Sequence, residues 1–231
     1  MDIIHISDLH IHRDQEKNKN TRSRLEKIMS MFQDDLLITT GDITDDGYLE
    51  QYQNISWLPG LKVPGNHDYG YAGNIYDRKK AERFDTTFGT AFSGKNYPKV
   101  DFVDGVKFIG LDSNLETDHP FDFACGEIGE PQIKHLKQKL SQKIRPIVLY
   151  LHHHPFMRND PFMELRDARK FMRAIYGRVD VLLFGHRHVE QLWYGTCGIK
   201  LIHAAGRLAD SDRVLRITID GGHVSSQYVG I

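Results

Sequence analysis

The sequence predicts an α/β fold, because apolar runs rich in β-branched residues alternate with helix-like stretches along the earlier part of the chain. From Val181 onward the apolar runs follow one another, so we expect a β-rich carboxyl-terminal part. Asp104-Gly105 and Gly221-Gly222 each separate two apolar runs, as tight hairpin turns do. The predicted strands are Ile3–Ile6, Leu36–Thr39, Val100–Val103, Val106–Leu111, Ile147–Leu151, Val181–Phe184, Ile199–Ile202, Val214–Ile219 and Val224–Val229.

Helical patterns separate the earlier strands, and one of them opens with Glu130-Pro131, a dipeptide suited to a helix start. Arg13–Asn20 and Thr117–Gly129 are predicted to be surface loops. A chain of 231 residues with 40% hydrophobic content can bury one sizeable core, so we expect a single domain over residues 1–231. The predicted helices are Thr21–Phe32, Tyr76–Phe88, Glu130–Lys139 and Asp160–Tyr176.

The charge balance is nearly neutral, with 30 Lys and Arg against 31 Asp and Glu. No global field therefore draws the chain to nucleic acid or to an anionic membrane. No apolar run approaches the roughly 20 residues that a membrane span requires, and the amino terminus has the pattern of a core strand, not of a signal peptide. Two cysteines, Cys125 and Cys197, suit a reducing compartment. We expect a cytoplasmic protein with no membrane partner.

Residue types that bind metals follow directly after apolar runs in five places, and strand ends are where α/β folds build their sites. Imidazole and carboxylate without sulfur suit Mn²⁺, Fe²⁺, Co²⁺ or Zn²⁺ better than Ca²⁺. Seven candidate ligands are too many for one ion and suit two ions that share a carboxylate. The five motifs are Ser7-Asp8-Leu9-His10, Gly41-Asp42-Ile43-Thr44-Asp45, Gly65-Asn66-His67-Asp68, His152-His153-His154-Pro155 and Gly185-His186-Arg187-His188.

Taken together and in this order, the five motifs resemble the calcineurin-like metallophosphoesterase superfamily over the stretch from Asp8 to His188. The resemblance implies a four-layer αββα sandwich of two mixed β-sheets flanked by helices. It also implies two divalent metal ions, of manganese, iron (Fe²⁺ or Fe³⁺) or zinc. In the family's pattern Asp8, His10 and His188 would bind the first ion, Asn66, His153 and His186 would bind the second, and Asp42 would bridge them.

In the fourth motif, the residues alone leave open which of His152, His153 and His154 is the ligand. Alternation along a strand points the two outer histidines one way and the middle one the other. We choose His153, since the family's ligand stands two positions before the proline, here Pro155. His5 lies inside the first predicted strand and His203 matches no motif, so both are expected to be core histidines without a catalytic role.

The resemblance further implies a phosphohydrolase in which hydroxide activated by the metals attacks phosphorus. His67 follows a ligand directly, so it should face the substrate and either protonate the leaving oxygen or stabilise the charge of the transition state, with Asp68 orienting it. Asp45 is expected to form hydrogen bonds and not to bind metal.

The compact length, the start Ser7-Asp8-Leu9-His10 and the motif His153-His154-Pro155 resemble the small bacterial branch that contains cyclic-nucleotide phosphodiesterases. We therefore favour a small phosphodiester as the substrate, a cyclic nucleotide among the possibilities. A nuclease is the first alternative, although the neutral composition argues against tight binding of nucleic acid. A phosphomonoesterase and a scaffold that lost catalysis are further alternatives, but every ligand position is filled here. The native metal pair and the oligomeric state stay open.

Overall fold

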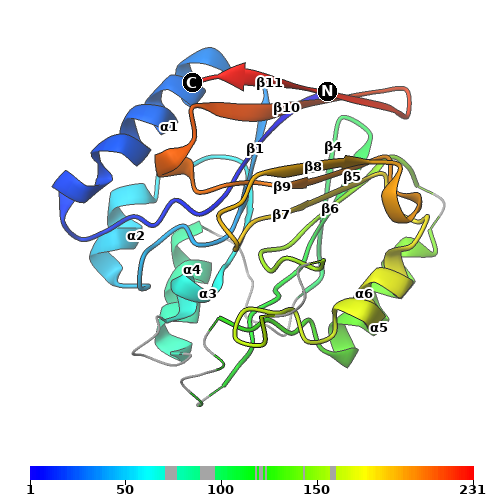
Figure 1. The fold of residues 1–231 in the computed structure, drawn as a ribbon, viewed down its shortest axis with the longest axis horizontal. Coiled ribbons are helices and arrows are strands. Elements are labelled where there is room, and N and C mark those ends of the chain that lie inside the picture. The colour runs from blue at the N-terminus through cyan, green and yellow to red at the C-terminus, as the bar shows by residue number, and fades with distance from the viewer. Residues whose placement is uncertain are drawn as a thin grey trace.

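The computed structural model describes residues 1–70, 77–88, 97–117, 119, 122, 124–142, 144–156 and 160–231, and two β-sheets stacked face to face dominate it (Figure 1). The five-stranded sheet has the order β11-β10-β1-β2-β3. Its strands are β1 (Asp2–Ile6), β2 (Leu36–Thr40), β3 (Leu61–Val63), β10 (Arg213–Asp220) and β11 (His223–Gly230). Strands β1, β2 and β3 are parallel and β10 and β11 antiparallel, so the sheet is mixed.

The six-stranded sheet has the order β4-β5-β6-β7-β9-β8. Four parallel strands form its centre, and an antiparallel strand closes each edge. Its strands are β4 (Lys99–Val103), β5 (Val106–Gly110), β6 (Ile147–Tyr150), β7 (Val181–Phe184), β8 (Gln191–Tyr194) and β9 (Leu201–Ala204).

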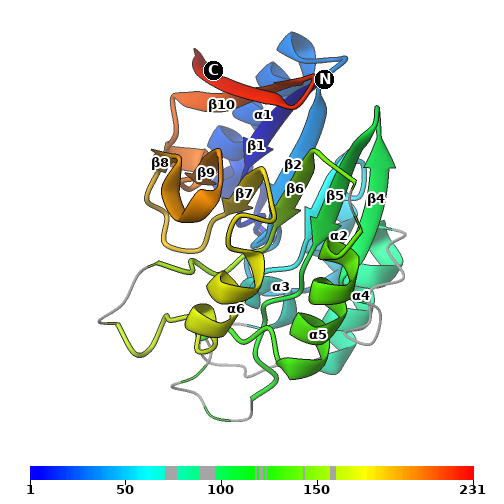
Figure 2. The same ribbon diagram turned by 90° about the vertical axis from the view of Figure 1, so that its right-hand side faces the viewer.

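Helices cover both outer faces, which confirms the αββα layering (Figures 1 and 2). The five-stranded sheet carries α1 (Lys19–Met31), α2 (Leu49–Ile55), α3 (Asn66–Tyr69) and α4 (Arg78–Phe88) on its side. The six-stranded sheet carries α5 (Glu130–Leu140) and α6 (Ala168–Ile175), which face the viewer in Figure 2. Short 3₁₀ turns lie at Gln15–Asn18, Thr196–Gly198 and Leu208–Asp210. Within the described residues, no helix is long and apolar enough to cross a membrane.

Alternation along the strands divides the core into three layers. In β1, Ile4 and Ile6 pack outward with the helical layer of α1 and α2, whereas Ile3 faces the other sheet. In β6, Val148 and Tyr150 point into the space between the sheets, and Leu149 points outward to α5 and α6. Because both faces of each sheet are buried, the strands are nearly continuous apolar runs. Each fully buried aliphatic side chain contributes about 1.5–3 kcal/mol.

All nine predicted strands are present, although the strand predicted at Ile199–Ile202 lies at Leu201–Ala204. Both predicted hairpins are confirmed, with φ of 48° and 78° at Asp104 and Gly105 and of 51° and 86° at Gly221 and Gly222. The predictions omitted β3 and β8, together with the short helices α2 and α3.

Two segment predictions are wrong in part. The stretch Arg13–Asn20 is not all loop, because it contains a 3₁₀ turn and the start of α1. The helix predicted from Asp160 begins only at Ala168, since the preceding residues pair with residue 126: Gly126 N–H donates to the Glu164 carbonyl, and Arg166 N–H donates to the Gly126 carbonyl. Tyr76, the predicted start of another helix, lies outside the described residues, as do parts of the Thr117–Gly129 loop.

Candidate metal centre

The five sequence motifs meet at one edge of the sandwich, where β1, β2, β3, β6 and β7 end. The backbone there is unusual, because non-glycine residues rarely adopt a positive φ and each instance costs about 1–3 kcal/mol. Within the described residues, seven non-glycine positions have a positive φ, and five of them are predicted ligands. These five are Asp8 (53°), His10 (46°), Asp42 (47°), His186 (75°) and His188 (54°). Strain concentrated in this way is typical of a functional site.

Two motif glycines allow the loops to approach one another closely. A Cβ at Gly185, after β7, would lie 1.9 Å from Ser7 Oγ, after β1 of the other sheet. A Cβ at Gly65 would lie 2.2 Å from Asp42 Oδ1. The absence of a side chain therefore lets the two sheets bring their ligands into one cluster.

The first ligand group consists of Asp8, His10, Asp42 and His188, whose donor atoms lie within 4.8 Å of one another. The Nε2 atoms of His10 and His188 are 3.1 Å apart, and His188 Nε2 is 3.4 Å from Asp8 Oδ1. Asp8 Oδ1 is buried and has no hydrogen-bond partner within the described residues. A buried carboxylate oxygen without a hydrogen bond is costly, and a cation bound here would compensate it.

The second group also contains Asp42, now with His152 and His186. His152 Nε2 lies 3.1 Å from Asn66 Oδ1, 3.2 Å from His186 Nδ1 and 3.4 Å from Asp42 Oδ2. Donor atoms that share one ion at bond lengths of about 2.0–2.2 Å are separated by roughly 3 to 3.5 Å. The residues present therefore fit an ion in each group, with the Asp42 carboxylate common to both.

Hydrogen bonds on the far side of the imidazoles fix which nitrogen faces the centre. His152 Nδ1–H donates to the Thr40 carbonyl at 2.7 Å, and His186 Nε2–H donates to the Met163 carbonyl at 3.3 Å. His10 Nδ1 lies 3.5 Å from Asp45 Oδ1. Metal-binding histidines commonly give their second N–H to a carbonyl or carboxylate in this way. Asp45 also accepts a hydrogen bond from His67 Nδ1–H through its backbone carbonyl, and its carboxylate forms a further cluster of donor atoms with His10 and His67. The expectation that Asp45 forms hydrogen bonds and does not bind metal stays a prediction.

His152, and not His153, belongs to the second group. The inward-facing series Val148 and Tyr150 continues to His152, whereas His153 continues the outward-facing series of Leu149 and Leu151. His153 Nδ1 is instead 2.9 Å from Ser113 Oγ. Apart from this shift by one residue, every ligand that the sequence predicts lies in one of the two groups or contacts it.

His67 lies at the rim of the centre, with its ring edge-on to His10 at a centroid distance of 4.7 Å. Its backbone N–H donates to Asp42 Oδ1 at 2.9 Å. Its Nδ1 is 2.6 Å from the Asp45 carbonyl oxygen, which only accepts, so Nδ1 carries the hydrogen. The ring is thus held by Asp45, and not by Asp68 as the sequence suggested.

Asp68 was expected to orient His67, but its carboxylate forms hydrogen bonds with two neighbouring loops instead. Its carboxylate is fully buried and accepts hydrogen bonds from the backbone N–H groups of Ile43 (3.2 Å), Thr44 (2.9 Å) and Gly65 (2.9 Å), and from the Thr44 hydroxyl (2.9 Å). Burial, with the charge of Asp42, raises the pKa of Asp68 to about 6. Asp68 therefore joins the loop that carries Asp42 to the loop that carries Asn66.

The cluster is electrostatically suited to a cation. Burial lowers the pKa of His152, but the negative charge of Asp42, its hydrogen bond to His152, the negative charge of Asp8 and the hydrogen bond to the Thr40 carbonyl outweigh burial and raise that pKa to about 9. Burial, followed by the positive charge on His152, lowers the pKa of His186 to about 3. The two carboxylates therefore favour positive charge within the cluster.

Sequence reasoning missed Thr40, Ser113 and Arg207. Arg207 is bridged to Ser7 through its backbone, and its Nε is buried without a hydrogen-bond partner in the described ranges. Its positive charge acts on His10 and His12, so it lies near the first group. The position of Gly206-Arg207 just after an apolar strand was the available signal, because the other motifs share it.

The fold and this centre define a class of protein, and comparison with known proteins agrees. The chain belongs to the calcineurin-like phosphoesterase family, whose model matches residues 1–190. It is 28% identical over 169 residues to a protein of Fibrobacter succinogenes named a probable cyclic nucleotide phosphodiesterase. The matched stretch covers 68% of this chain and 58% of that relative. It is 27% identical over 168 residues to a probable glycerophosphodiester phosphodiesterase, GpdQ, of Arcobacter nitrofigilis, which covers 67% of this chain and 56% of that relative.

The chain thus spans less than two thirds of the length of these two relatives. The crystal structure of a dimetal phosphatase from Danio rerio superposes with a TM-score of 0.72 over 100% of this chain and 96% of that one. At 12% identity, this likeness shows the shared fold.

Proposed function

We propose that the protein is a phosphohydrolase that works with two divalent metal ions and that its substrates are phosphodiesters, cyclic nucleotides among them. The observation that carries the proposal is the Asp42 carboxylate shared by two ligand groups. The names of the two relatives, one for cyclic nucleotides and one for glycerophosphodiesters, support a diester substrate. The ligands we propose are Asp8, His10, Asp42 and His188 for the first ion, and Asp42, Asn66, His152 and His186 for the second.

Nitrogen and oxygen donors without sulfur suit manganese, iron or zinc. When bound, two such ions would supply positive charge for the phosphate and would lower the pKa of bound water. The chain contributes preorganisation: the positive-φ loops and the buried hydrogen bonds to Thr40, Met163 and Asp45 hold the imidazoles in place before substrate arrives.

His67 is the residue we propose for proton transfer. The Asp45 carbonyl fixes Nδ1 as a donor, so Nε2 is the ring atom at which a proton is gained or lost. Beside His10 at the rim, that nitrogen is placed to protonate the leaving oxygen or to donate a hydrogen bond to the phosphate in the transition state.

Replacing His67 with Ala should lower turnover by about two to four orders of magnitude, because general acid catalysis contributes that much. Metal content should stay near that of the wild type, since His67 lies outside both ligand groups that contain Asp42. Turnover and metal content are measured on the same preparation. The matched control is His12→Ala, because His12 also contacts Asp45, at 3.1 Å, and should keep its turnover. Equal turnover in His67→Ala and wild type would remove His67 from catalysis.

Metal removal tests the function directly. We expect the chelator-treated protein to be inactive, and Mn²⁺ or a similar ion to restore cleavage of bis(p-nitrophenyl) phosphate well above that of p-nitrophenyl phosphate. Cyclic AMP turnover in the same series tells whether cyclic nucleotides are substrates. Faster cleavage of the monoester would make the protein a phosphomonoesterase. No cleavage of any of these with Mn²⁺, Mg²⁺ or Zn²⁺ would contradict the proposal, and nucleic acid would then be tried.

A further inference from the structure

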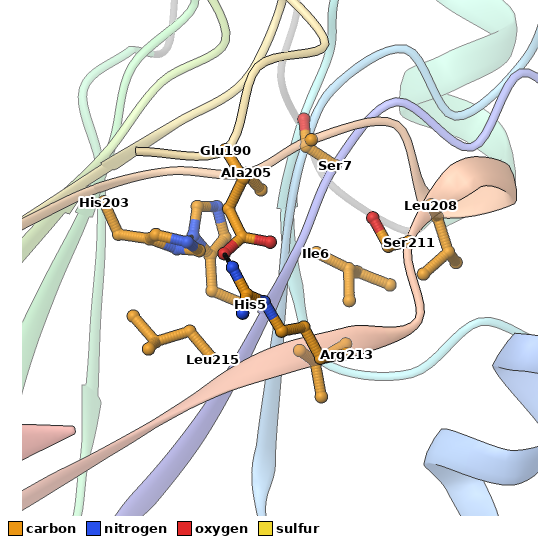
Figure 3. A pocket seen from close by; sticks show the side chains of 12 residues that line it. His5, Ile6, Ser7, Glu190, His203, Ala205, Leu208, Ser211, Arg213 and Leu215 are labelled. Carbon is orange, nitrogen blue, oxygen red and sulfur yellow. Dashed lines mark hydrogen bonds and ion pairs between the residues drawn. The ribbon is translucent and has the colours of Figure 1, made fainter. Parts of the chain in front are cut away.

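Two histidines outside the metal centre form a hydrogen bond across the middle of the sandwich. His5 lies on β1 of the five-stranded sheet and His203 on β9 of the six-stranded sheet, and Figure 3 shows their rings next to each other. Their Nδ1 atoms are 2.7 Å apart and the rings meet edge to face at 80°. Exposure is 1% for His5 and 2% for His203. One imidazole must donate the hydrogen that the other accepts.

This pair continues into the metal centre through Thr40. His5 Nε2 is 3.0 Å from Thr40 Oγ1, and the Thr40 carbonyl accepts from His152 Nδ1–H at 2.7 Å and from Ser7 Oγ at 3.0 Å. Ser7, Thr40 and His152 are all fully buried. A continuous buried path of polar contacts therefore runs from His203 through His5 and Thr40 to a proposed ligand of the second ion.

The path matters because the ligands are divided between the two sheets. Asp8, His10, Asp42 and Asn66 follow strands of the five-stranded sheet, whereas His152, His186 and His188 follow β6 and β7 of the six-stranded sheet. The centre keeps its geometry only if the offset between the sheets is fixed. Apolar packing is non-directional, whereas a hydrogen bond constrains both distance and angle.

Neighbouring positions on the same faces of β1 and β9 carry apolar side chains, so packing by itself does not require a polar residue at positions 5 and 203. On the same inward face, β1 carries Ile3 two residues before His5, and β9 carries Leu201 two residues before His203. A buried imidazole is costly unless its nitrogens find partners. Beside the pair, Glu190 and Arg213 form an ion pair at 3.0 Å, which Figure 3 also shows, but this contact lies nearer the surface.

We propose that His5 and His203 are positioning residues, whose hydrogen bond, continued through Thr40, sets the place of His152 and the spacing between the two halves of the metal centre. The inference rests on the proposed dinuclear centre. Both residues act through others and do not touch the ions or the substrate.

The experiment compares metal binding by full-length variants in which His203 is replaced. His203→Leu removes the hydrogen bond, and His203→Asn restores a polar atom near the place of Nδ1. Metal-stripped protein is titrated with Mn²⁺ by calorimetry and by electron paramagnetic resonance, which distinguishes a coupled Mn²⁺ pair from isolated ions. We expect His203→Leu to weaken binding of the second ion by about 10-fold, the lower end of the range for loss of a hydrogen bond made directly to a metal ligand, because His203 acts on His152 through His5 and Thr40. The coupled signal should weaken with it. His203→Asn should recover most of the affinity for the second ion and most of the coupled signal.

Leu201→Val is the matched control, because Leu201 lies on the same face of β9 and is fully buried but is no part of the polar path. It should lower the melting temperature and leave both ions bound. If His203→Leu fails to fold, the double variant His5→Leu/His203→Leu takes its place. It removes both imidazoles, so no buried histidine is left without its partner, and it should show the same loss of the second ion.

Wild-type affinity for both ions in a folded His203→Leu or double variant would overturn the proposal and leave the pair with a purely structural role. A wild-type protein that binds fewer than two Mn²⁺ ions would instead overturn the dinuclear centre, and this inference with it. The two failures are therefore read from different samples.

Discussion

Asp42→Asn should lower hydrolysis by about three orders of magnitude or more, because two metal ions would supply several kcal/mol of transition-state stabilisation and the proposed centre shares Asp42 between them. Its Oδ2 lies 3.4 Å from His152 Nε2 and 3.8 Å from His10 Nε2, and its Oδ1 accepts the His67 N–H. An amide has no charge and only one oxygen, so it cannot replace the carboxylate in both groups. The loss of metal from both sites is measured by elemental analysis beside turnover.

The control for this variant is Asp46→Asn in the same loop. Asp46 faces Arg13 at 3.7 Å and is not a member of either ligand group, so the variant should keep both ions and most of its activity. Wild-type turnover or two retained ions in Asp42→Asn would refute the shared carboxylate.

The second large effect separates His152 from His153. In both positions Asn can keep the hydrogen bond that Nδ1 makes, to the Thr40 carbonyl or to Ser113 Oγ, while it removes Nε2. His152→Asn should lose the second ion and at least about 100-fold of turnover, because loss of metal stabilisation amounts to several kcal/mol. His153→Asn should keep two ions and lose little activity. Metal content and kcat of the two variants are compared side by side.

The melting temperature of each variant is measured as well, since both histidines are fully buried and substitution of a buried side chain lowers stability. The opposite pattern, with the second ion lost only from His153→Asn, would return the ligand to the position that the spacing from Pro155 first indicated. Equal loss in both variants would mean that the turn as a whole, and not one imidazole, holds the ion.

Much of this protein follows from local sequence. Strands were predictable because burial on both faces of each sheet makes them continuous apolar runs. The hairpin at Asp104-Gly105 was predictable because this dipeptide readily adopts the positive φ values that a tight turn requires. Most ligands were predictable because each stands directly after such a run. Gly185 before His186 also indicated a close approach of the backbone, and the structure shows that only glycine fits there beside Ser7.

Prediction failed where a contact joins distant segments. The start of the helix predicted from Asp160 was wrong because its first residues pair with Gly126, which local periodicity cannot register. β3 escaped notice because it has only three residues, and β8 because it lies partly exposed at a sheet edge.

The sequence by itself determined the kinds of proposed ligand, their order and most of the strands that carry them; β3, which precedes Asn66, is the exception. The tertiary structure decided which of two adjacent histidines faces the centre, because alternation shows that His152 and His153 point oppositely but not which side meets the other sheet. It also decided that His5 meets His203, 198 positions away, since only the stacking of two sheets brings them together. Side-chain chemistry is a local property of the chain, whereas the distance between two side chains depends on how the strands pair and the sheets pack.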